Sequence, residues 1–99
     1  MKTLILPVKR KWFDLIKSGE KKFEFRLQND YWERRLLGSR DRYGMIVVTL
    51  GYPKKTDASK RLVFKYKGWM EQKIISSEFG PNPVDVFAIP LIPFDAVEQ

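Results

Sequence analysis

The chain has 99 residues, and we expect residues 1–99 to form one compact domain with its own core. Cysteine and histidine do not occur, which excludes disulfides, thiolate zinc sites, cysteine nucleophiles and catalytic triads that use an imidazole. The net charge of +7 favours a polyanionic partner, although such an excess also serves simply to keep a surface soluble. The apolar runs are too short for a membrane span or a signal peptide, so we expect a cytoplasmic protein.

The first two predicted elements are a strand over residues 2–8 and a short helix over residues 9–19. In the helix, the spacing i, i+1, i+3, i+4 places four apolar side chains on one face: Trp12, Phe13, Leu15 and Ile16. Gly19 suits the position after the last turn, because glycine readily adopts the left-handed backbone conformation found there.

Residues 20–27 change to a period of two, which is typical of a strand. Apolar side chains on one face alternate with charged side chains on the other, namely Phe23, Phe25 and Leu27 against Lys22, Glu24 and Arg26. A face with three charges either lies in water or lines a polar cleft, and the periodicity does not decide between these two arrangements.

A second short helix is predicted over residues 29–38, where Asp30 and Glu33 resemble a capping box and Gly38 suits the end. A charged loop follows over residues 39–44. Four arginines gather around this helix end and loop, and they are the best candidates for contacts to a phosphate backbone: Arg34, Arg35, Arg40 and Arg42.

The rest of the chain reads mostly as strands. We expect a central strand over residues 43–50, a loop over 51–59, and a half-buried strand over 61–69. Residues 70–75 either continue that strand or form a bent second piece, residues 76–83 form a turn, and residues 84–92 form the last strand. The pattern predicts an α+β domain with two short helices in its N-terminal half, folded as a small barrel or open sheet.

Residues 19–26, GEKKFEFR, resemble the G-x-K-x-x-E-x-R signature of ASCH (activating signal cointegrator homology) domains. The signature stands where that family places it, after a first strand and a short helix. Residues 12–18 resemble the helix of the family, and residues 31–32, 49–53 and 79–81 resemble a compact group found in phages and prophages. The resemblance covers essentially the whole chain.

The resemblance implies a PUA-like β-barrel of about five or six strands, with a cleft lined by Lys21, Glu24 and Arg26. The family is generally taken to bind RNA. A few members are reported as ribonucleases or as amidohydrolases that act on acylated cytidine nucleosides. In that amidohydrolase branch a threonine stands where this chain has Glu24, which argues against the deacylating activity.

The three motif residues also have plausible roles by their own chemistry. Arg26 offers a planar fork for phosphate, Lys21 a compact cation or a base, and Glu24 an acceptor for a base amine or ribose hydroxyl, or a general base. Glu24 and Arg26 share one face of the strand, but Lys21 joins them only if the strand begins irregularly. The alternative is an ion-pair cluster that only neutralises buried charge.

Aromatic rings for stacking against bases are also available. Tyr52, in a loop between Gly51 and Pro53, is the preferred exposed ring. Further candidates are Tyr31, Trp32, Tyr66 and Trp69, of which the two tryptophans more often serve to cover a core.

Three functions remain open, and we favour a non-catalytic module that binds RNA or a nucleotide-like ligand, without metal or cofactor. The second is a histidine-free ribonuclease or modified-nucleoside amidohydrolase that uses Lys21 and Glu24. The third is a protein-interaction domain of phage origin that binds a host protein.

Overall fold

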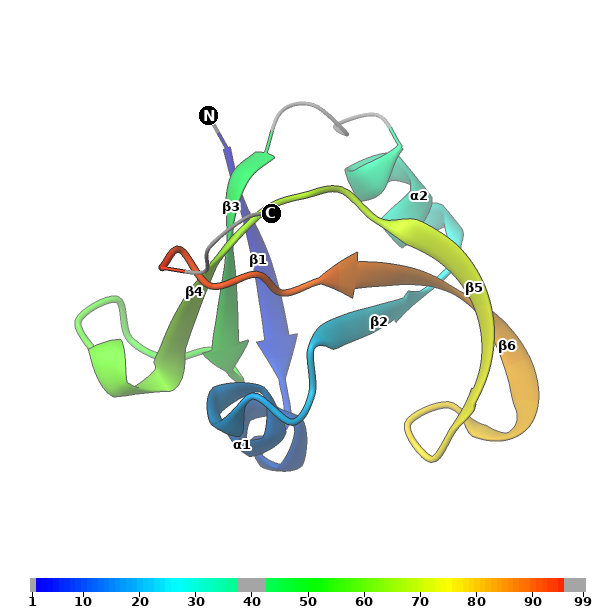
Figure 1. Ribbon diagram of the computed structural model, residues 1–99, viewed down its shortest axis with the longest axis horizontal. Helices are drawn as coiled ribbons and strands as arrows, with labels where there is room; N and C mark the ends of the chain where they lie inside the picture. Colours follow the sequence, from blue (N-terminus) through cyan, green and yellow to red (C-terminus); the bar gives the residue numbers. More distant parts are fainter. Residues whose placement is uncertain (1, 38–42, 96–99) are drawn as a thin grey trace.

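The computed structural model describes residues 2–37 and 43–95, and Figure 1 shows the arrangement of their elements. These ranges hold two helices and six strands, with one 3-10 turn, η1, before the fourth strand. The bounds are β1 Lys2–Val8, α1 Arg10–Ser18, β2 Phe23–Leu27, α2 Asp30–Leu36, β3 Tyr43–Leu50, η1 Ala58–Lys60, β4 Arg61–Lys65, β5 Met70–Ser76 and β6 Gly80–Pro90. The predicted α+β class and the two early helices are confirmed.

The strands form two three-stranded sheets. The first has the order β1-β3-β4, in which β3 is central as predicted and pairs in parallel with β1. The second has the order β2-β6-β5 and is antiparallel throughout. One isolated bridge, in which the Lys65 N–H donates to the Ile92 carbonyl at 2.7 Å, connects the end of β4 to the segment after β6. No closed barrel is found in the described part of the chain, so the barrel expectation is not confirmed.

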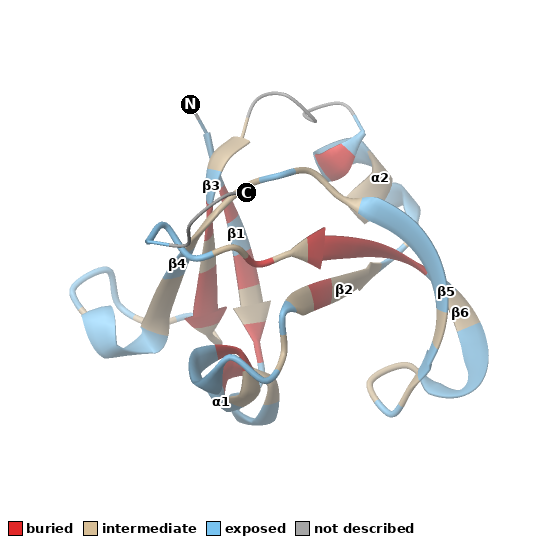
Figure 2. Ribbon diagram, viewed as in Figure 1, coloured by how far each residue is buried: buried red, intermediate tan, exposed pale blue. Residues whose placement is uncertain are grey.

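The core takes residues from both sheets and both helices. On β1, Leu4, Leu6 and Val8 are buried at every second position, as the pleat of a strand requires. The other members of the cluster are Phe13, Ile16, Leu36, Ile46, Val48, Phe87, Ile89 and Leu91. Figure 2 shows these buried segments of β1, β3, β6 and α1 facing the middle of the molecule.

The predicted strand over residues 61–69 is too long. It ends at Lys65, and the chain then crosses to the other sheet, where β5 begins at Met70. Gly68, at φ 85°, lies in this crossing, and few residues other than glycine adopt that backbone conformation. Of the two alternatives for residues 70–75, continuation of the preceding strand is therefore wrong, because β5 belongs to the second sheet.

The last strand begins at Gly80, four residues before the predicted start at Val84. Pro81 and Pro83, which favoured a turn, are accommodated because β2 pairs only with the Val86–Pro90 half of β6. Proline lacks the N–H that a neighbouring strand needs, and it is tolerated where one side of a strand has no partner.

The cap of α2 also differs from the prediction. The Asn29 side chain, not that of Asp30, accepts the Trp32 N–H at 3.0 Å, and Asp30 is the first helical residue. The predicted exit at Gly38 lies outside the described residues. Neither described helix is long and apolar enough to cross a membrane.

Candidate functional site

The charged face of β2 points into the molecule. The strand register places Glu24 opposite Ile89 and Arg26 opposite Phe87, and both of these β6 residues belong to the core. Glu24 is completely buried, at 0% relative exposure, while Leu27 on the other face is exposed. The solvated alternative is therefore wrong for Glu24 and Arg26, which line a polar cleft.

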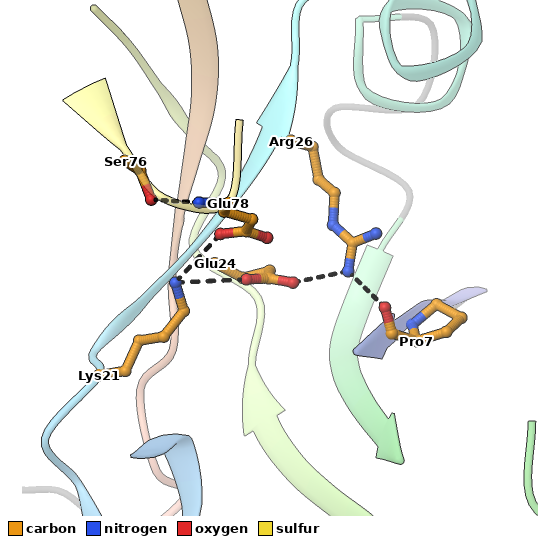
Figure 3. A network of polar contacts seen from close by, with 6 residues as sticks. All are labelled: Pro7, Lys21, Glu24, Arg26, Ser76 and Glu78. Carbon is orange, nitrogen blue, oxygen red and sulfur yellow. Dashed lines mark hydrogen bonds and ion pairs between the residues drawn. The ribbon is translucent and has the colours of Figure 1, made fainter. Parts of the chain in front are cut away.

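Lys21 reaches Glu24 because it precedes the regular strand. Its backbone N–H donates to the Leu15 carbonyl at 3.0 Å, and β2 begins only at Phe23. Its Nζ lies 3.6 Å from Glu24 Oε1 (Figure 3) and 4.9 Å and 4.7 Å from the ring centroids of Trp12 and Phe25. The irregular start that the hypothesis required is present, and Lys21 and Glu24 converge.

Arg26 holds the other side of Glu24. Its Nη2 lies 2.6 Å from Glu24 Oε2 and donates to the Pro7 carbonyl at 2.8 Å, as Figure 3 shows. Its guanidinium also lies over the Trp32 ring, 4.9 Å from the centroid. These contacts connect β2 to the end of β1 and to α2.

Glu78 is a fourth charged member of the cluster that sequence reasoning missed. It stands in the turn between β5 and β6, and its carboxylate lies 3.9 Å from Lys21 Nζ (Figure 3). Ser76 fixes this turn by accepting the Glu78 N–H at 3.2 Å. Burial, and then the negative charge of Glu24, raise the pKa of Glu78 above its usual range. No local pattern marks Glu78, because only the tertiary fold brings this turn to β2.

A cleft of about 480 Å³ opens beside this cluster, and we call it the motif cleft. Such a volume lies within the range of about 300–1,000 Å³ that is usual for ligand sites. It is lined by Pro7, Val8, Lys9, Lys11, Trp12, Glu24, Arg26, Ser77 and Glu78. Lys9 and Lys11 are exposed, whereas Glu24 is buried and Glu78 is partly buried, so the cleft combines exposed cations with shielded carboxylates.

Lys21 does not line the motif cleft, contrary to the expectation from the signature. It lines a separate, more apolar groove together with Leu62 and Phe64 of β4, and its ammonium reaches the two carboxylates from there. The side chain is only 12% exposed. In this structure Lys21 holds the two carboxylates in place and does not face the cleft.

Three polar atoms at the motif cleft are buried without a hydrogen bond to any described residue: Glu24 Oε1, Arg26 Nε and Glu78 Oε2. Buried polar atoms of this kind are uncommon in folded proteins. They comprise one N–H donor and two carboxylate acceptors. The two carboxylate oxygens lie 3.6 Å and 3.9 Å from Lys21 Nζ, so the lysine ammonium partly compensates them.

The remaining predicted site residues are distributed differently. Tyr52 is 93% exposed, as expected. Arg35 is exposed, with its guanidinium 4.4 Å from the Tyr31 ring centroid, and the exposed Arg34 does not line the motif cleft. Arg40 and Arg42 lie outside the described residues. Trp32 and Trp69 are partly buried against the core, in agreement with the covering role.

Within the described ranges, no three acidic side chains gather closely enough to hold a metal ion. Comparison with known proteins gives no match: neither a protein-family profile, nor a curated protein, nor a solved structure matches this chain.

Proposed function

We propose that this protein is an RNA- or nucleotide-binding module of the ASCH type that holds one nucleotide in the motif cleft. The observation that carries the proposal is the charged cluster of Glu24, Arg26 and Glu78, which lines a cleft of about 480 Å³ together with the exposed cations Lys9 and Lys11. The bridge from Lys65 to Ile92 supports the further proposal that the two sheets form a partly open, PUA-like barrel.

The charge arrangement supports a nucleotide better than a simple anion. A bare phosphate would meet the Glu24 and Glu78 carboxylates, which repel it. In a nucleotide the negative charge and the hydrogen-bond donors lie on different groups: the phosphate bears the charge, and the base and ribose bear N–H and O–H donors. Lys9 and Lys11 suit the phosphate, and the two carboxylates suit the donors.

One observation favours a hydrolase as the second candidate. Glu78, whose pKa is raised by burial, lines the cleft beside Glu24, and a carboxyl group with a raised pKa can act as a general acid. The earlier assignment of a catalytic role to Lys21 has less support, because Lys21 is paired with both carboxylates and lies outside the cleft lining.

The test is fluorescence anisotropy with a labelled single-stranded RNA hexamer of mixed sequence, titrated at several salt concentrations. The double variant Lys9→Gln/Lys11→Gln removes two exposed cations of the cleft, and Lys17→Gln/Lys73→Gln removes two exposed cations elsewhere. We expect the first variant to bind more weakly and its salt slope to fall by up to about 1.4, from about 0.7 per phosphate contact on a single strand. The control should keep the wild-type slope.

A second variant, Arg26→Gln, tests the buried part of the cleft, with thermal unfolding as a check that the domain still folds. Equal binding by the wild type, the cleft variant and the control would overturn the proposal. If the wild type shortens the RNA on a gel and the variant Glu78→Gln does not, the hydrolase becomes the better conclusion. Binding that is absent at every salt concentration would leave a protein partner as the leading alternative.

A further inference from the structure

A second pocket adjoins the motif cleft. It has a volume of about 560 Å³ and shares two lining residues with the cleft, Pro7 and Arg26. We call it the stacking pocket, and its other lining residues are Ile5 of β1, Tyr31, Trp32 and Arg35 of α2, and Tyr52 of the loop after β3. A ligand that fills the motif cleft and extends past Arg26 therefore enters the stacking pocket.

The stacking pocket offers flat surfaces. The guanidinium of Arg35 lies 4.4 Å from the Tyr31 ring centroid and 6.0 Å from that of Trp32, and the two rings meet edge to face at 5.1 Å. Aromatic rings and guanidinium planes are the groups on which unpaired bases stack in proteins that bind single strands. Its charge is also favourable, because both charged side chains of the pocket, Arg26 and Arg35, are cations.

Tyr52 presents its ring on a fixed backbone. Although the side chain is 93% exposed, the loop is tied at three points. The Gly51 N–H donates to the Val8 carbonyl at 3.0 Å, the buried Thr49 hydroxyl donates to the Gly51 carbonyl at 2.7 Å, and Arg61 lies 3.4 Å from the Pro53 carbonyl. Because the backbone is already fixed, a ligand that stacks on Tyr52 has to order only the two side-chain torsions of the ring.

We propose that the protein binds single-stranded RNA across at least two consecutive nucleotides. One nucleotide occupies the motif cleft and the base of its neighbour stacks in the stacking pocket against Tyr52 and Tyr31, with Arg26 between the two sites. This inference rests on the proposed function and sharpens it, because it makes an RNA strand, and not a free nucleoside or mononucleotide, the preferred ligand.

The test compares two classes of probe by isothermal titration calorimetry: the four ribonucleoside 5′-monophosphates, and homodinucleotides of the same four bases with a 5′-phosphate. The variants are Tyr52→Ala and the double variant Tyr31→Ala/Tyr52→Ala. Tyr52→Phe keeps the ring, and Phe94→Ala removes an exposed ring that lines neither site. Because Tyr52 is exposed, its variants should keep the fold, and circular dichroism checks this.

We expect at least one dinucleotide to bind roughly tenfold or more tightly than its monophosphate, because stacking of one base is lost in the shorter probe. Tyr52→Ala should remove most of that gain and leave the monophosphate affinity unchanged. Tyr52→Phe and Phe94→Ala should behave as the wild type.

Dinucleotides that bind no more tightly than monophosphates, or a gain that survives the double tyrosine variant, would overturn the two-nucleotide inference and leave the proposed function standing. If neither class of probe binds, both fail. If dinucleotide binding needs Tyr52 but is unchanged in Lys9→Gln/Lys11→Gln, the motif cleft does not hold the first nucleotide. In that case both the inference and the proposed function are wrong about the cleft.

Discussion

The motif cleft and the arm formed by β5 and β6 each contain a pair of opposite charges, but the two pairs differ in their exposure to water. In the cleft, Arg26 Nη2 lies 2.6 Å from Glu24 Oε2, with side-chain exposures of 17% and 1%. On the arm, Lys73 Nζ lies 3.8 Å from Asp85 Oδ1 across the β5–β6 ladder, with exposures of 67% and 63%. Figure 2 shows the same contrast, with the outer part of the arm exposed and the strands next to the core buried.

The difference shows that burial, more than the identity of the side chains, decides what a charge pair does. The arm pair competes with water and costs the fold little when it is removed. The cleft pair is largely shielded from water, so removal of either partner leaves the other charge without compensation. A cluster of this kind is costly to keep, which is consistent with the proposed role in binding a ligand.

The largest effect is expected from Glu24→Ala. The substitution leaves Lys21 and Arg26 without their shared carboxylate, and loss of one member of a buried pair costs about 3–5 kcal/mol of the free energy of unfolding. Urea denaturation followed by tryptophan fluorescence measures it. The matched change on the arm, Asp85→Ala, should cost no more than about 1 kcal/mol. Similar losses for the two variants would break the comparison.

A smaller effect is expected from Arg26→Lys, which keeps the charge but loses the planar fork. One terminal nitrogen, Nη2, donates to both Glu24 and the Pro7 carbonyl, and the planar guanidinium lies over the Trp32 ring. Lysine cannot reproduce this arrangement, so we expect a loss of about 1–2 kcal/mol in the same denaturation experiment. The reverse change on the arm, Lys73→Arg, should fall within about 0.5 kcal/mol of the wild type. An unchanged stability of Arg26→Lys would mean that charge alone holds the cluster.

Glu78 should make stability depend on pH. Because the pKa of Glu78 is raised in the folded state, folding favours its protonated form, and this stabilisation is present below the ordinary pKa of glutamate. It is lost as the pH rises through the raised pKa. Stability of the wild type relative to Glu78→Gln should therefore fall as the pH rises above the ordinary pKa of glutamate, about 4.3, until Glu78 is ionised in the folded protein. Parallel pH profiles of the two proteins would contradict the burial of this carboxyl group.

The smallest effect is expected for the coupling between Lys73 and Asp85. A double-mutant cycle should give about 0.5 kcal/mol or less, and 1 M salt should abolish it because exposed charges are screened. The corresponding cycle for Glu24 and Arg26 should keep most of its coupling at the same salt concentration. Equal salt sensitivity in the two cycles would remove the distinction between cleft and arm.

Much of the fold follows from local patterns. The α1 stripe with Gly19 at its end and the alternation along β1 are local signals, and each gave an element with nearly correct bounds. The errors fall where tertiary context overrides such signals. The chain crosses between sheets at Gly68, and Pro81 and Pro83 lie in a strand because β2 does not flank that half of β6.

The site was predictable only in part, for a related reason. Glu24 and Arg26 were identified from the signature and from their shared face, and the exposure of Tyr52 from its place in a loop between glycine and proline. Glu78 was not, because the turn that carries it has no pattern of its own. Which side of the cluster Lys21 occupies depends on side-chain packing that periodicity does not describe.

The pairing of β2 with β6 has a consequence for how the protein folds. The strand that carries Glu24 has its hydrogen-bonded neighbour at the far end of the chain, and the turn with Glu78 also comes late. Strand pairings between residues distant in sequence form slowly, because the entropy of closing a long loop is lost before the stabilising contacts form. We therefore expect Glu24 and Arg26 to stay hydrated until β6 pairs with β2, and the motif cleft to be among the last features of the domain to form.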